Sequence, residues 1–325
     1  MKRVAVLDDY QGVVLALPHW ARLQGRASVE AFRDTQKSED ALAERLRPYQ
    51  VLVPIRERTR FTASLLARLP ALELLALTGR NSGHVDVAAA TARGVLVVES
   101  ASSGQAAIEH TIGLLLAAVR RIPQEDRALR AGRWQTTVGV ELAGKTLGIV
   151  GFGRIGSRIG AFGGFLGMRV LAWGPTLTAE RAAAGGATYV PLETLLAESD
   201  VVSLHTRLSD QTRGLITAPR LALMKPTAYL INTARGPIVD EAALVGALRE
   251  RRIAGAALDV FDEEPLPAGH PLAALDNVVL TPHLGFVTHE AYDVFFRGAV
   301  DNILRWLDGG VPERTLNPAA RPQGR

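Results

Sequence analysis

The chain has 325 residues, 47% of them hydrophobic, which is enough apolar material to fill two ordinary domain cores. The net charge is only +4, and Lys and Arg are interspersed with Asp and Glu, so the composition does not indicate nucleic acid as a partner. Cysteine is absent, which excludes a disulfide framework, a thiolate metal site and a cysteine nucleophile.

The first residues lack an apolar signal core followed by a cleavage site, and the apolar run Leu114–Val119 is too short to span a bilayer. We therefore expect a soluble, cytoplasmic protein with no membrane partner. The motifs described below contain no metal-ligand set, so we predict no bound metal.

Short apolar runs recur along the chain and predict buried strands. They are Val4–Leu7, Val51–Ile55, Leu72–Thr78, Val95–Val98, Leu147–Val150, Arg169–Trp173, Val201–Leu204, Ala228–Asn232, Ala256–Val260 and Asn277–Thr281. Segments with helical spacing lie between them, namely Ser102–Arg121, Ile155–Phe165, Thr194–Ser199 and Glu241–Arg251. This alternation predicts an α/β fold with helices on both faces of parallel sheets. The polar, proline-containing tail Asn317–Arg325 is expected to be disordered.

A glycine-rich turn follows the strand that ends at Val150 and opens a helical segment. The turn consists of Gly151, Phe152, Gly153, Arg154, Ile155 and Gly156. In a dinucleotide-binding fold the first glycine permits the tight turn, the second lets the backbone approach a pyrophosphate, and the third lets the helix pack on the strand. A G-x-G-x-x-G pattern alone is weak, but the order strand, turn, helix favours a dinucleotide cofactor.

The residue that usually bonds the cofactor ribose is an Asp or Glu about 20 positions further on, at the end of the next strand. Here the strand Arg169–Trp173 is followed by Gly174, so the carboxylate that would repel a ribose 2′-phosphate is missing. Arg181 and Arg207 are candidates for attracting that phosphate, with ordinary solvated arginines as an equal alternative. We predict NAD or NADP as cofactor, with NAD slightly favoured.

Three further segments place charged residues after predicted strands: Ile231–Gly236, Leu258–Pro265 and Leu280–Gly285. Ligands of doubly wound sheets bind at the carboxyl ends of the strands, where Arg235, Glu264 and His283 fall. We therefore expect these three side chains to share one site.

These motifs, in this order, resemble the D-isomer-specific 2-hydroxyacid dehydrogenase family over most of the chain. Ser103–Thr111 resembles the helix that enters the nucleotide domain of that family, and Asn232–Asp240 resembles its motif around the substrate arginine. The resemblance implies a hydride transfer between NAD(P)H and a small 2-keto acid or D-2-hydroxy acid.

By this resemblance Arg235 binds substrate, His283 is the acid–base residue and Glu264 is its carboxylate partner. Histidine gains and loses protons near neutral pH, which suits a reaction that runs in both directions. A neighbouring carboxylate stabilises the imidazolium and orients the ring, and the donor fork of an arginine grips carboxylate and carbonyl oxygens. Asp262 and Glu263 compete with Glu264 for the partner role, which the following proline assigns to Glu264.

The resemblance also extends the cofactor site to Gly174, His205, Arg207, Thr233, Ala234 and Asp259. His205 is the rival histidine, but its position resembles a family histidine that is structural or near the cofactor. Asp259 matches a position near the nicotinamide carboxamide, and it can at the same time be a buried, hydrogen-bonded carboxylate. Arg207 departs from the family pattern, in which a proline is usual.

The turn Thr78–Asp86 resembles the loop that supplies backbone N–H groups to the substrate carboxylate, and we assign Arg80, Asn81, Ser82 and Gly83 to substrate binding. An asparagine stands where the family often has glycine, and asparagine tolerates left-handed backbone. A plain surface turn is the alternative.

The fold implied by these motifs is a Rossmann NAD(P) domain, residues 101–289, inserted into a flavodoxin-like substrate domain, residues 1–100 with 290–325. The active site then lies in the cleft between two doubly wound parallel-sheet domains, with hinges near Ser100 and Val287. A homodimer is expected from the family, with the apolar segment Ile108–Ile122 as dimer helix or as a core helix of its own domain.

Two other functions remain open from the sequence. A non-catalytic NAD(H)-sensing regulatory protein of the same fold could keep all three catalytic residues. A formate dehydrogenase is disfavoured because Pro282, not a glutamine, precedes His283. The sequence does not specify which 2-hydroxy acid is the substrate. A phosphorylated acid stays possible because the N-terminal domain contains Arg56, Arg58, Arg60 and Arg80.

Overall fold

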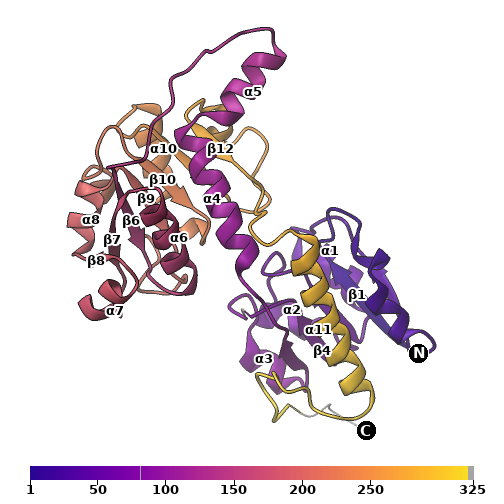
Figure 1. Ribbon diagram of the computed structural model, residues 1–325. Helices are drawn as coiled ribbons and strands as arrows, with labels where there is room; N and C mark the ends of the chain where they lie inside the picture. The colour runs from indigo at the N-terminus through magenta and orange to yellow at the C-terminus, as the bar shows by residue number, and fades with distance from the viewer. Residues whose placement is uncertain (81, 321–325) are drawn as a thin grey trace. The chain divides into compact units, whose positions relative to one another are not determined.

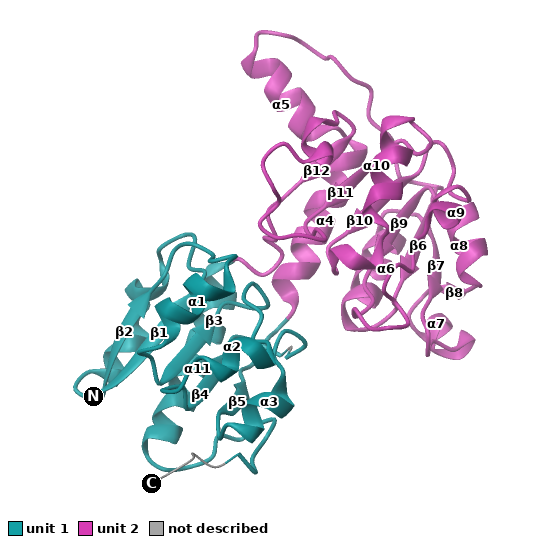
Figure 2. Ribbon diagram, turned by 180° about the vertical axis from the view of Figure 1, so that it is seen from behind, with its two compact units in different colours: residues 1–103, 288–325 teal, residues 104–287 magenta. Residues whose placement is uncertain are grey.

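The computed structural model describes residues 1–80 and 82–320 (Figure 1). The chain divides into two compact units (Figure 2). Unit 1 comprises Met1–Ser103 and the chain from Thr288 onward, and unit 2 comprises Gly104–Val287. Each unit is built on a sheet whose paired strands all run parallel, which confirms the predicted fold class.

Unit 1 contains a five-stranded sheet in the order β2-β1-β3-β4-β5, the flavodoxin-like arrangement. Its strands are β1 (Lys2–Leu7), β2 (Ala27–Ala31), β3 (Val51–Pro54), β4 (Leu74–Leu77) and β5 (Leu96–Glu99). Its helices are η1 (Val14–Ala16), η2 (Pro18–Leu23), α1 (Glu39–Leu46), α2 (Ala63–Ala67), α3 (Val87–Ala92) and α11 (His289–Leu307). Helices α1, α2 and α3 share one apolar core with the sheet, and α11 packs on β4 and η2. The last long helix thus belongs to the fold of the first hundred residues.

Unit 2 contains a seven-stranded sheet in the order β12-β11-β10-β9-β6-β7-β8, which is a Rossmann order with one added strand. Its strands are β6 (Thr146–Val150), β7 (Arg169–Trp173), β8 (Thr188–Tyr189), β9 (Val201–Leu204), β10 (Tyr229–Asn232), β11 (Gly255–Leu258) and β12 (Val278–Leu280). Its helices are α4 (Gln105–Val119), α5 (Ile122–Arg130), α6 (Arg154–Phe165), α7 (Ala179–Ala184), α8 (Leu192–Glu198), α9 (Ala218–Leu221), η3 (Gly236–Ile238), α10 (Glu241–Arg249) and η4 (Pro271–Ala274). Two apolar clusters fill this unit, and β6, β9, β10 and β11 contribute to both because their side chains alternate between the faces.

Two short strands were not predicted, β2 and β8. Both lie at an edge of their sheet, and β8 has two exposed residues while β2 alternates exposed and covered ones. Edge strands are covered less completely than central ones, so their sequences lack the continuous apolar run that marks a buried strand.

The predicted disorder of the tail is wrong for its first residues. The side chain of Asn317 accepts a hydrogen bond from the Val97 N–H at 2.8 Å and donates to the carbonyl of Val95 at 2.9 Å. Asn317 and Ala320 are both buried. This side chain, together with backbone hydrogen bonds that join Arg314 and Leu316 to β5, fixes the end of the chain there. Residues 321–325 lie outside the described residues.

Within the described residues, no helix combines the length and the hydropathy that crossing a bilayer requires. The same part of the chain holds no group of three or more His, Asp or Glu side chains arranged to bind a metal ion.

Candidate active site

The carboxyl ends of the central strands of unit 2 stand in register. Val150 is paired with Leu204, Leu204 with Asn232, Asn232 with Leu258, and Leu258 with Leu280. The loops that follow these residues therefore leave the sheet from the same edge, as expected for a ligand site of a doubly wound sheet. They carry the glycine turn, His205, Arg235, Asp259 and His283 in that spatial order.

The three glycines of the turn differ in how closely other atoms approach them. Gly151 has φ +101°, and a Cβ atom there would lie 2.6 Å from the carbonyl carbon of His205. A Cβ atom at Gly156 would lie 2.1 Å from the carbonyl oxygen of Gly151. By contrast, a Cβ atom at Gly153 would meet no described atom within 4 Å. Packing thus requires the first and third glycines, and the second leaves the start of α6 open to an anion.

The other residues of the turn divide between core and surface. The ring of Phe152 is buried and would contact a Cβ atom at Gly160, and Ile155 packs against the same apolar cluster. Arg154 is exposed, and its guanidinium lies next to Gly104. The turn therefore offers backbone groups to a cofactor, with Phe152 forming one side of the cavity beside it.

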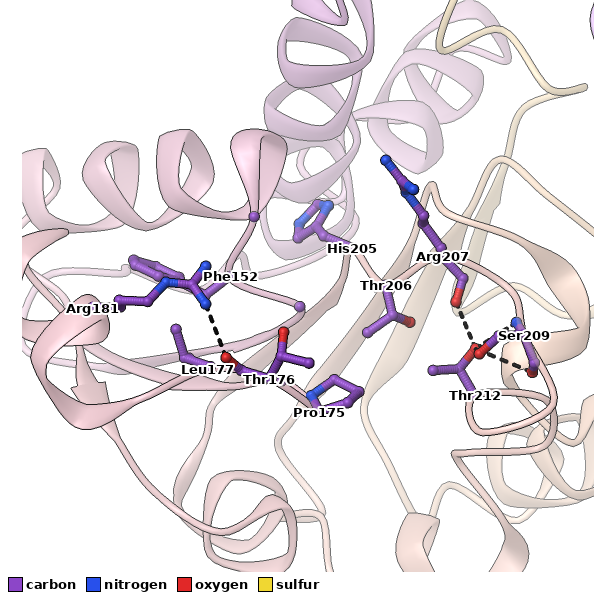
Figure 3. Close-up of a pocket in the computed structure, with 13 residues that line it drawn as sticks. Phe152, Pro175, Thr176, Leu177, Arg181, His205, Thr206, Arg207, Ser209 and Thr212 are labelled. Atoms are coloured by element: carbon purple, nitrogen blue, oxygen red, sulfur yellow. Dashed lines mark hydrogen bonds between the residues drawn. The ribbon is translucent and has the colours of Figure 1, made fainter. Parts of the chain in front are cut away.

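A cavity of about 240 Å³ adjoins the glycine turn (Figure 3). The Oγ1 atom of Thr206, which lines it, is buried and has no hydrogen-bond partner among the described residues. A buried hydroxyl without a partner is costly, so this wall of the cavity fits a polar ligand. The residues that line the cavity are Gly151, Phe152, Gly153, Gly174, Pro175, Thr176, Leu177, Arg181, His205, Thr206, Arg207, Ser209 and Thr212. These residues fit the ribose and pyrophosphate of a dinucleotide, and none of them is acidic.

His205 lines this cavity and is not suited to proton transfer near neutral pH. Burial lowers the pKa of His205 to about 4. Its Nε2 atom lies 2.9 Å from the hydroxyl of Ser203 at the end of β9. The ring is therefore neutral under physiological conditions, in agreement with its interpretation as a structural or cofactor-proximal residue.

The segment after β10 is fixed by the side chain of Asn232. This buried amide accepts a hydrogen bond from the Ala234 N–H and donates one to the Arg235 carbonyl, both at 3.0 Å. Thr233 is held from the other side, because its hydroxyl lies 2.7 Å from that of Thr111 on α4. The Arg235 guanidinium also donates to the Ala234 carbonyl. Arg235 thus projects from a turn whose backbone is pinned on both sides.

Gly236 brings the Arg235 turn against the loop that carries Glu264. A Cβ atom at Gly236 would lie 2.0 Å from the carbonyl carbon of Phe261, so the two backbones are in direct contact. The Phe261 N–H in turn donates to Oε1 of Glu264 at 3.0 Å. The Arg235 turn and the Glu264 loop therefore form one packed unit.

Gly236→Ala is expected to lower the free energy of unfolding by about 3 kcal/mol, because a backbone and not a flexible side chain would have to move. Urea denaturation measures this change. Gly246→Ala in α10 is the matched control: the nearest described atom to its Cβ would be Arg252 Nη2 at 3.5 Å. Removing a glycine from a helix should stabilise by about 1 kcal/mol. An equal change in the free energy of unfolding for the two variants would contradict the packing described for Gly236.

His283 and Glu264 form the pair that the sequence predicts. The Nδ1 atom of His283 lies 2.6 Å from Oε2 of Glu264, and the two side chains are 18% and 28% exposed. Against an ionised carboxylate Nδ1 carries the proton, which leaves Nε2 to exchange protons with a ligand. Nε2 has no hydrogen-bond partner among the described residues. The Phe286 ring stands edge-on to the imidazole, with the centroids 5.4 Å apart.

Asp259 anchors the loop that carries His283. Its Oδ1 atom accepts hydrogen bonds from the Thr281 hydroxyl at 2.6 Å and the Leu284 N–H at 2.7 Å, and Oδ2 accepts from the Gly285 N–H at 2.9 Å. Burial raises the pKa of Asp259, but its hydrogen bonds, including one to His110, outweigh this and lower the pKa below its usual value. Asp259 is therefore a buried carboxylate whose oxygens accept hydrogen bonds from the protein itself.

His110 and Thr281 are site residues that the sequence analysis missed. Nε2 of His110, on α4, lies 3.1 Å from Oδ1 of Asp259 and 3.0 Å from the Thr281 hydroxyl. The two residues are 171 positions apart, and no local pattern links a histidine in a helix to a threonine after a strand. His283 itself has φ +53°, a left-handed conformation that the anchored loop must enforce.

Asp259→Asn is expected to lower the free energy of unfolding at pH 7 by about 3 kcal/mol, since an NH₂ group would face an N–H donor. The pKa of this carboxyl is lower in the folded protein than in the unfolded chain, where it is about 3.9. Its ionised form therefore stabilises the folded protein at any pH above that value, and this stabilisation is lost as the pH falls through the folded-state pKa. The deficit of the variant should thus be constant from about pH 8 to 5 and shrink below about pH 4. Urea midpoints across this range measure it.

Asp262→Asn is the control for this prediction. Asp262 is exposed, and burial together with the Glu241 carboxylate raises its pKa, so neutralising it removes an unfavourable charge. The free energy of unfolding of Asp262→Asn should therefore equal or exceed that of the wild-type protein. A loss equal to that of Asp259→Asn would show that any amide in this loop destabilises unit 2.

The loop assigned to the substrate carboxylate lies in unit 1, after β4. Arg80 and Gly83 are exposed and Ser82 is partly exposed. The N–H groups of Arg80 and Ser82 make no hydrogen bond within the described residues, whereas the Gly79 N–H is occupied by the Ser100 hydroxyl at 2.6 Å. Asn81 lies outside the described residues.

Comparison with known proteins identifies the family. Residues 112–285 match the profile "D-isomer specific 2-hydroxyacid dehydrogenase, NAD binding domain". The glyoxylate reductase of Aeropyrum pernix is 43% identical over 268 residues, which cover 79% of this chain and 80% of that protein. The D-3-phosphoglycerate dehydrogenase of Archaeoglobus fulgidus is 39% identical over 79% of this chain, which spans only 49% of that protein.

Comparison with solved structures points to the same family. A phosphoglycerate oxidoreductase from Vibrio cholerae O395 has a TM-score of 0.91 and 40% identity, covering 95% of this chain and 100% of that one. The D-lactate dehydrogenase of Aquifex aeolicus, complexed with NAD and lactic acid, has a TM-score of 0.79 and 28% identity, covering 97% and 99%. The parallel sheet of each unit and the glycine turn agree with these similarities. The chain therefore belongs to the D-isomer-specific 2-hydroxyacid dehydrogenase family.

Proposed function

We propose that this protein is an NAD(P)H-dependent reductase of small 2-keto acids, which it converts reversibly to D-2-hydroxy acids. The observation that carries the proposal is the His283–Glu264 pair, 2.6 Å apart and on the same sheet edge as an open glycine turn. When bound, the nicotinamide supplies the hydride that adds to the carbonyl carbon. The residues of the chain then have to supply a proton, hold the acid and polarise its carbonyl.

His283 is the proposed proton donor. In reduction its Nε2 gives a proton to the oxygen of the former carbonyl, and in oxidation it takes that proton from the hydroxyl group. Glu264 accepts a hydrogen bond from Nδ1, which fixes the ring and compensates the positive charge of the protonated form. Because Oε1 of Glu264 accepts the Phe261 N–H, the carboxylate itself is held in place.

Arg235 is the proposed substrate-binding residue. A guanidinium presents parallel N–H donors that match a carboxylate and an adjacent carbonyl oxygen, and its charge polarises that carbonyl toward hydride attack. The turn around Arg235, pinned by Asn232, limits the entropy lost on binding. In unit 1 we assign Arg80, Ser82 and Gly83 to the substrate carboxylate, supported by the N–H groups of Arg80 and Ser82 that bond to no described residue.

The cofactor-binding residues are proposed to be the glycine turn, Gly174, His205 and Arg207 around the cavity, and Thr233 and Ala234 after β10. Asp259 contributes by holding the His283 loop. The substrate class follows from the relatives, which include glyoxylate reductases, so we infer a short 2-keto acid such as glyoxylate or hydroxypyruvate.

We also propose a homodimer. Helix α4, the predicted dimer helix, places Ile108, Leu115 and Val119 in the core of unit 2, which favours the core-helix interpretation. Four exposed apolar residues lie in the next segment, α5 and the chain after it, which extends away from the sheet of unit 2 in Figures 1 and 2. They are Ile122, Leu129, Trp134 and Val138, and exposed apolar groups of this kind suit a second copy of the chain.

The test is a panel of 2-keto acids, glyoxylate, hydroxypyruvate, pyruvate, phenylpyruvate and phosphohydroxypyruvate, assayed with NADH and with NADPH. We expect reduction of at least one short keto acid, seen as loss of the reduced-nicotinamide absorbance. Tight cofactor binding without turnover of any of these acids would favour a cofactor-sensing protein instead.

A further inference from the structure

The cavity beside the glycine turn bears on the choice between NAD and NADP, which the sequence leaves open. Strand β7 ends at Trp173, and the next residues, Gly174, Pro175 and Thr176, form a wall of the cavity without a carboxylate. A carboxylate at this place would bond the ribose hydroxyls of NAD and repel a 2′-phosphate. In this chain Gly174, Pro175 and Thr176 carry no charge, so none of them repels that phosphate.

The fold does not require a glycine at position 174. A Cβ atom at Gly174 would come no closer than 3.5 Å to Leu177 and 3.8 Å to the backbone of Phe152, which are ordinary van der Waals distances. Gly174 also has no positive φ angle. Neither the packing around a Cβ atom nor the backbone conformation therefore requires glycine at this position.

Arg181 supplies a positive charge at this wall. Its Nη1 atom donates a hydrogen bond to the Thr176 carbonyl at 2.9 Å, which holds the guanidinium over the turn after β7. Figure 3 shows the guanidinium between Phe152 and Thr176. Within the described residues no carboxylate forms an ion pair with Arg181, and the Thr176 hydroxyl has no partner. A cation and a hydroxyl are thus available together for one anion.

Arg207 is placed differently. Its side chain points away from Thr176 in Figure 3, and its carbonyl accepts the Thr212 hydroxyl. Ser209 is tied to the same threonine, since its N–H donates to Thr212 Oγ1 at 2.8 Å. The Ser209 N–H and the Thr212 hydroxyl are therefore bonded within this loop. Because the Arg207 side chain points away from Thr176, Arg181 is the better placed of the two arginines.

We propose that Arg181 and Thr176 bind the 2′-phosphate of NADP(H), and that this chain prefers NADP(H) to NAD(H). The inference rests on the proposed function, because it assigns the cofactor of that same site. The guanidinium would form charge-assisted hydrogen bonds to the phosphate oxygens, and the threonine hydroxyl would add one more. A phosphate bound here also needs no loss of an existing ion pair of Arg181.

Isothermal titration calorimetry with NADP⁺, NAD⁺, 2′,5′-ADP and 5′-AMP tests the proposal without turnover. We expect the wild-type protein to bind NADP⁺ about tenfold or more tightly than NAD⁺, and 2′,5′-ADP more tightly than 5′-AMP by a similar factor. Arg181→Gln should weaken NADP⁺ and 2′,5′-ADP by about 10- to 100-fold and change NAD⁺ by less than about twofold.

Three variants serve as comparisons. Arg249→Gln removes one charge from the exposed surface of α10, outside the cavity, and should leave all four affinities unchanged. Gly174→Asp should reverse the preference toward NAD⁺, while Gly174→Ala, which adds a Cβ without charge, should keep it. These changes separate a local phosphate contact from the general charge of the protein.

Equal affinity of the wild-type protein for NADP⁺ and NAD⁺, or equal weakening of both by Arg181→Gln, would overturn the inference and leave the proposed function intact. Failure of every one of these nucleotides to bind would overturn both together.

Discussion

His283→Asn is expected to lower kcat for 2-keto acid reduction by a factor of about 10³, because the variant lacks the proposed donor of the proton to the carbonyl oxygen. Asparagine is the informative replacement, since His283 has φ +53° and asparagine is among the residues that tolerate this backbone conformation. The dissociation constants of the dinucleotides should change by less than about twofold, because the cavity beside the glycine turn does not include His283.

The control for this variant is His19→Asn. His19 also pairs with a carboxylate, Asp293 at 2.8 Å, but both residues belong to the packing of η2 against α11 in unit 1. Steady-state kinetics of the two variants should therefore differ, with kcat retained in His19→Asn. A His283→Asn protein with wild-type kcat would remove His283 from the mechanism.

Arg235→Lys is expected to lower kcat/KM by about 10²-fold, with KM raised and kcat reduced. Lysine keeps the positive charge, but its single ammonium group cannot present two parallel N–H donors to a carboxylate and a carbonyl oxygen. A change in both constants is expected because, in the proposed mechanism, the guanidinium contacts the substrate before and during hydride addition.

Arg249→Lys, on the exposed surface of α10, is the matched substitution and should leave both constants unchanged. Initial rates over a range of keto acid concentrations at saturating NAD(P)H give both constants. If Arg235→Lys retains the wild-type KM and kcat, the arginine has no fork-like contact with the substrate, and its role in the site is structural.

The central strands could be predicted because burial on both faces leaves a plain signal. Val51–Pro54 and Val201–Leu204 are wholly buried, and each has a continuous apolar sequence apart from one small polar residue or proline. The strands β2 and β8 escape the same reasoning, since an edge strand is only partly covered and reads as loop. The prediction for the tail fails for a related reason. Its composition suggests disorder, but the buried amide of Asn317 and the backbone hydrogen bonds just before it join the chain to β5.

The His283–Glu264 pair could be predicted because its residues follow strands, and the ends of parallel strands meet at one edge. The residues that hold this pair in place could not be predicted in the same way. His110, Thr281 and Asp259 come from a helix and two strand ends, and their mutual distances depend on how α4 packs on β11 and β12. A sequence shows where a strand ends, but not which side chain of a covering helix reaches it.

The most direct test of the central claim is the fate of the hydride. The protein is incubated with hydroxypyruvate and NADPH deuterated at the transferable C4 position, and the glycerate formed is analysed by NMR and by chiral chromatography. The proposed function predicts D-glycerate with one deuterium at C2, and no such product from His283→Asn at comparable times. Glycerate without deuterium at C2, or with the L configuration, would contradict direct hydride transfer to the carbonyl carbon in a D-specific site.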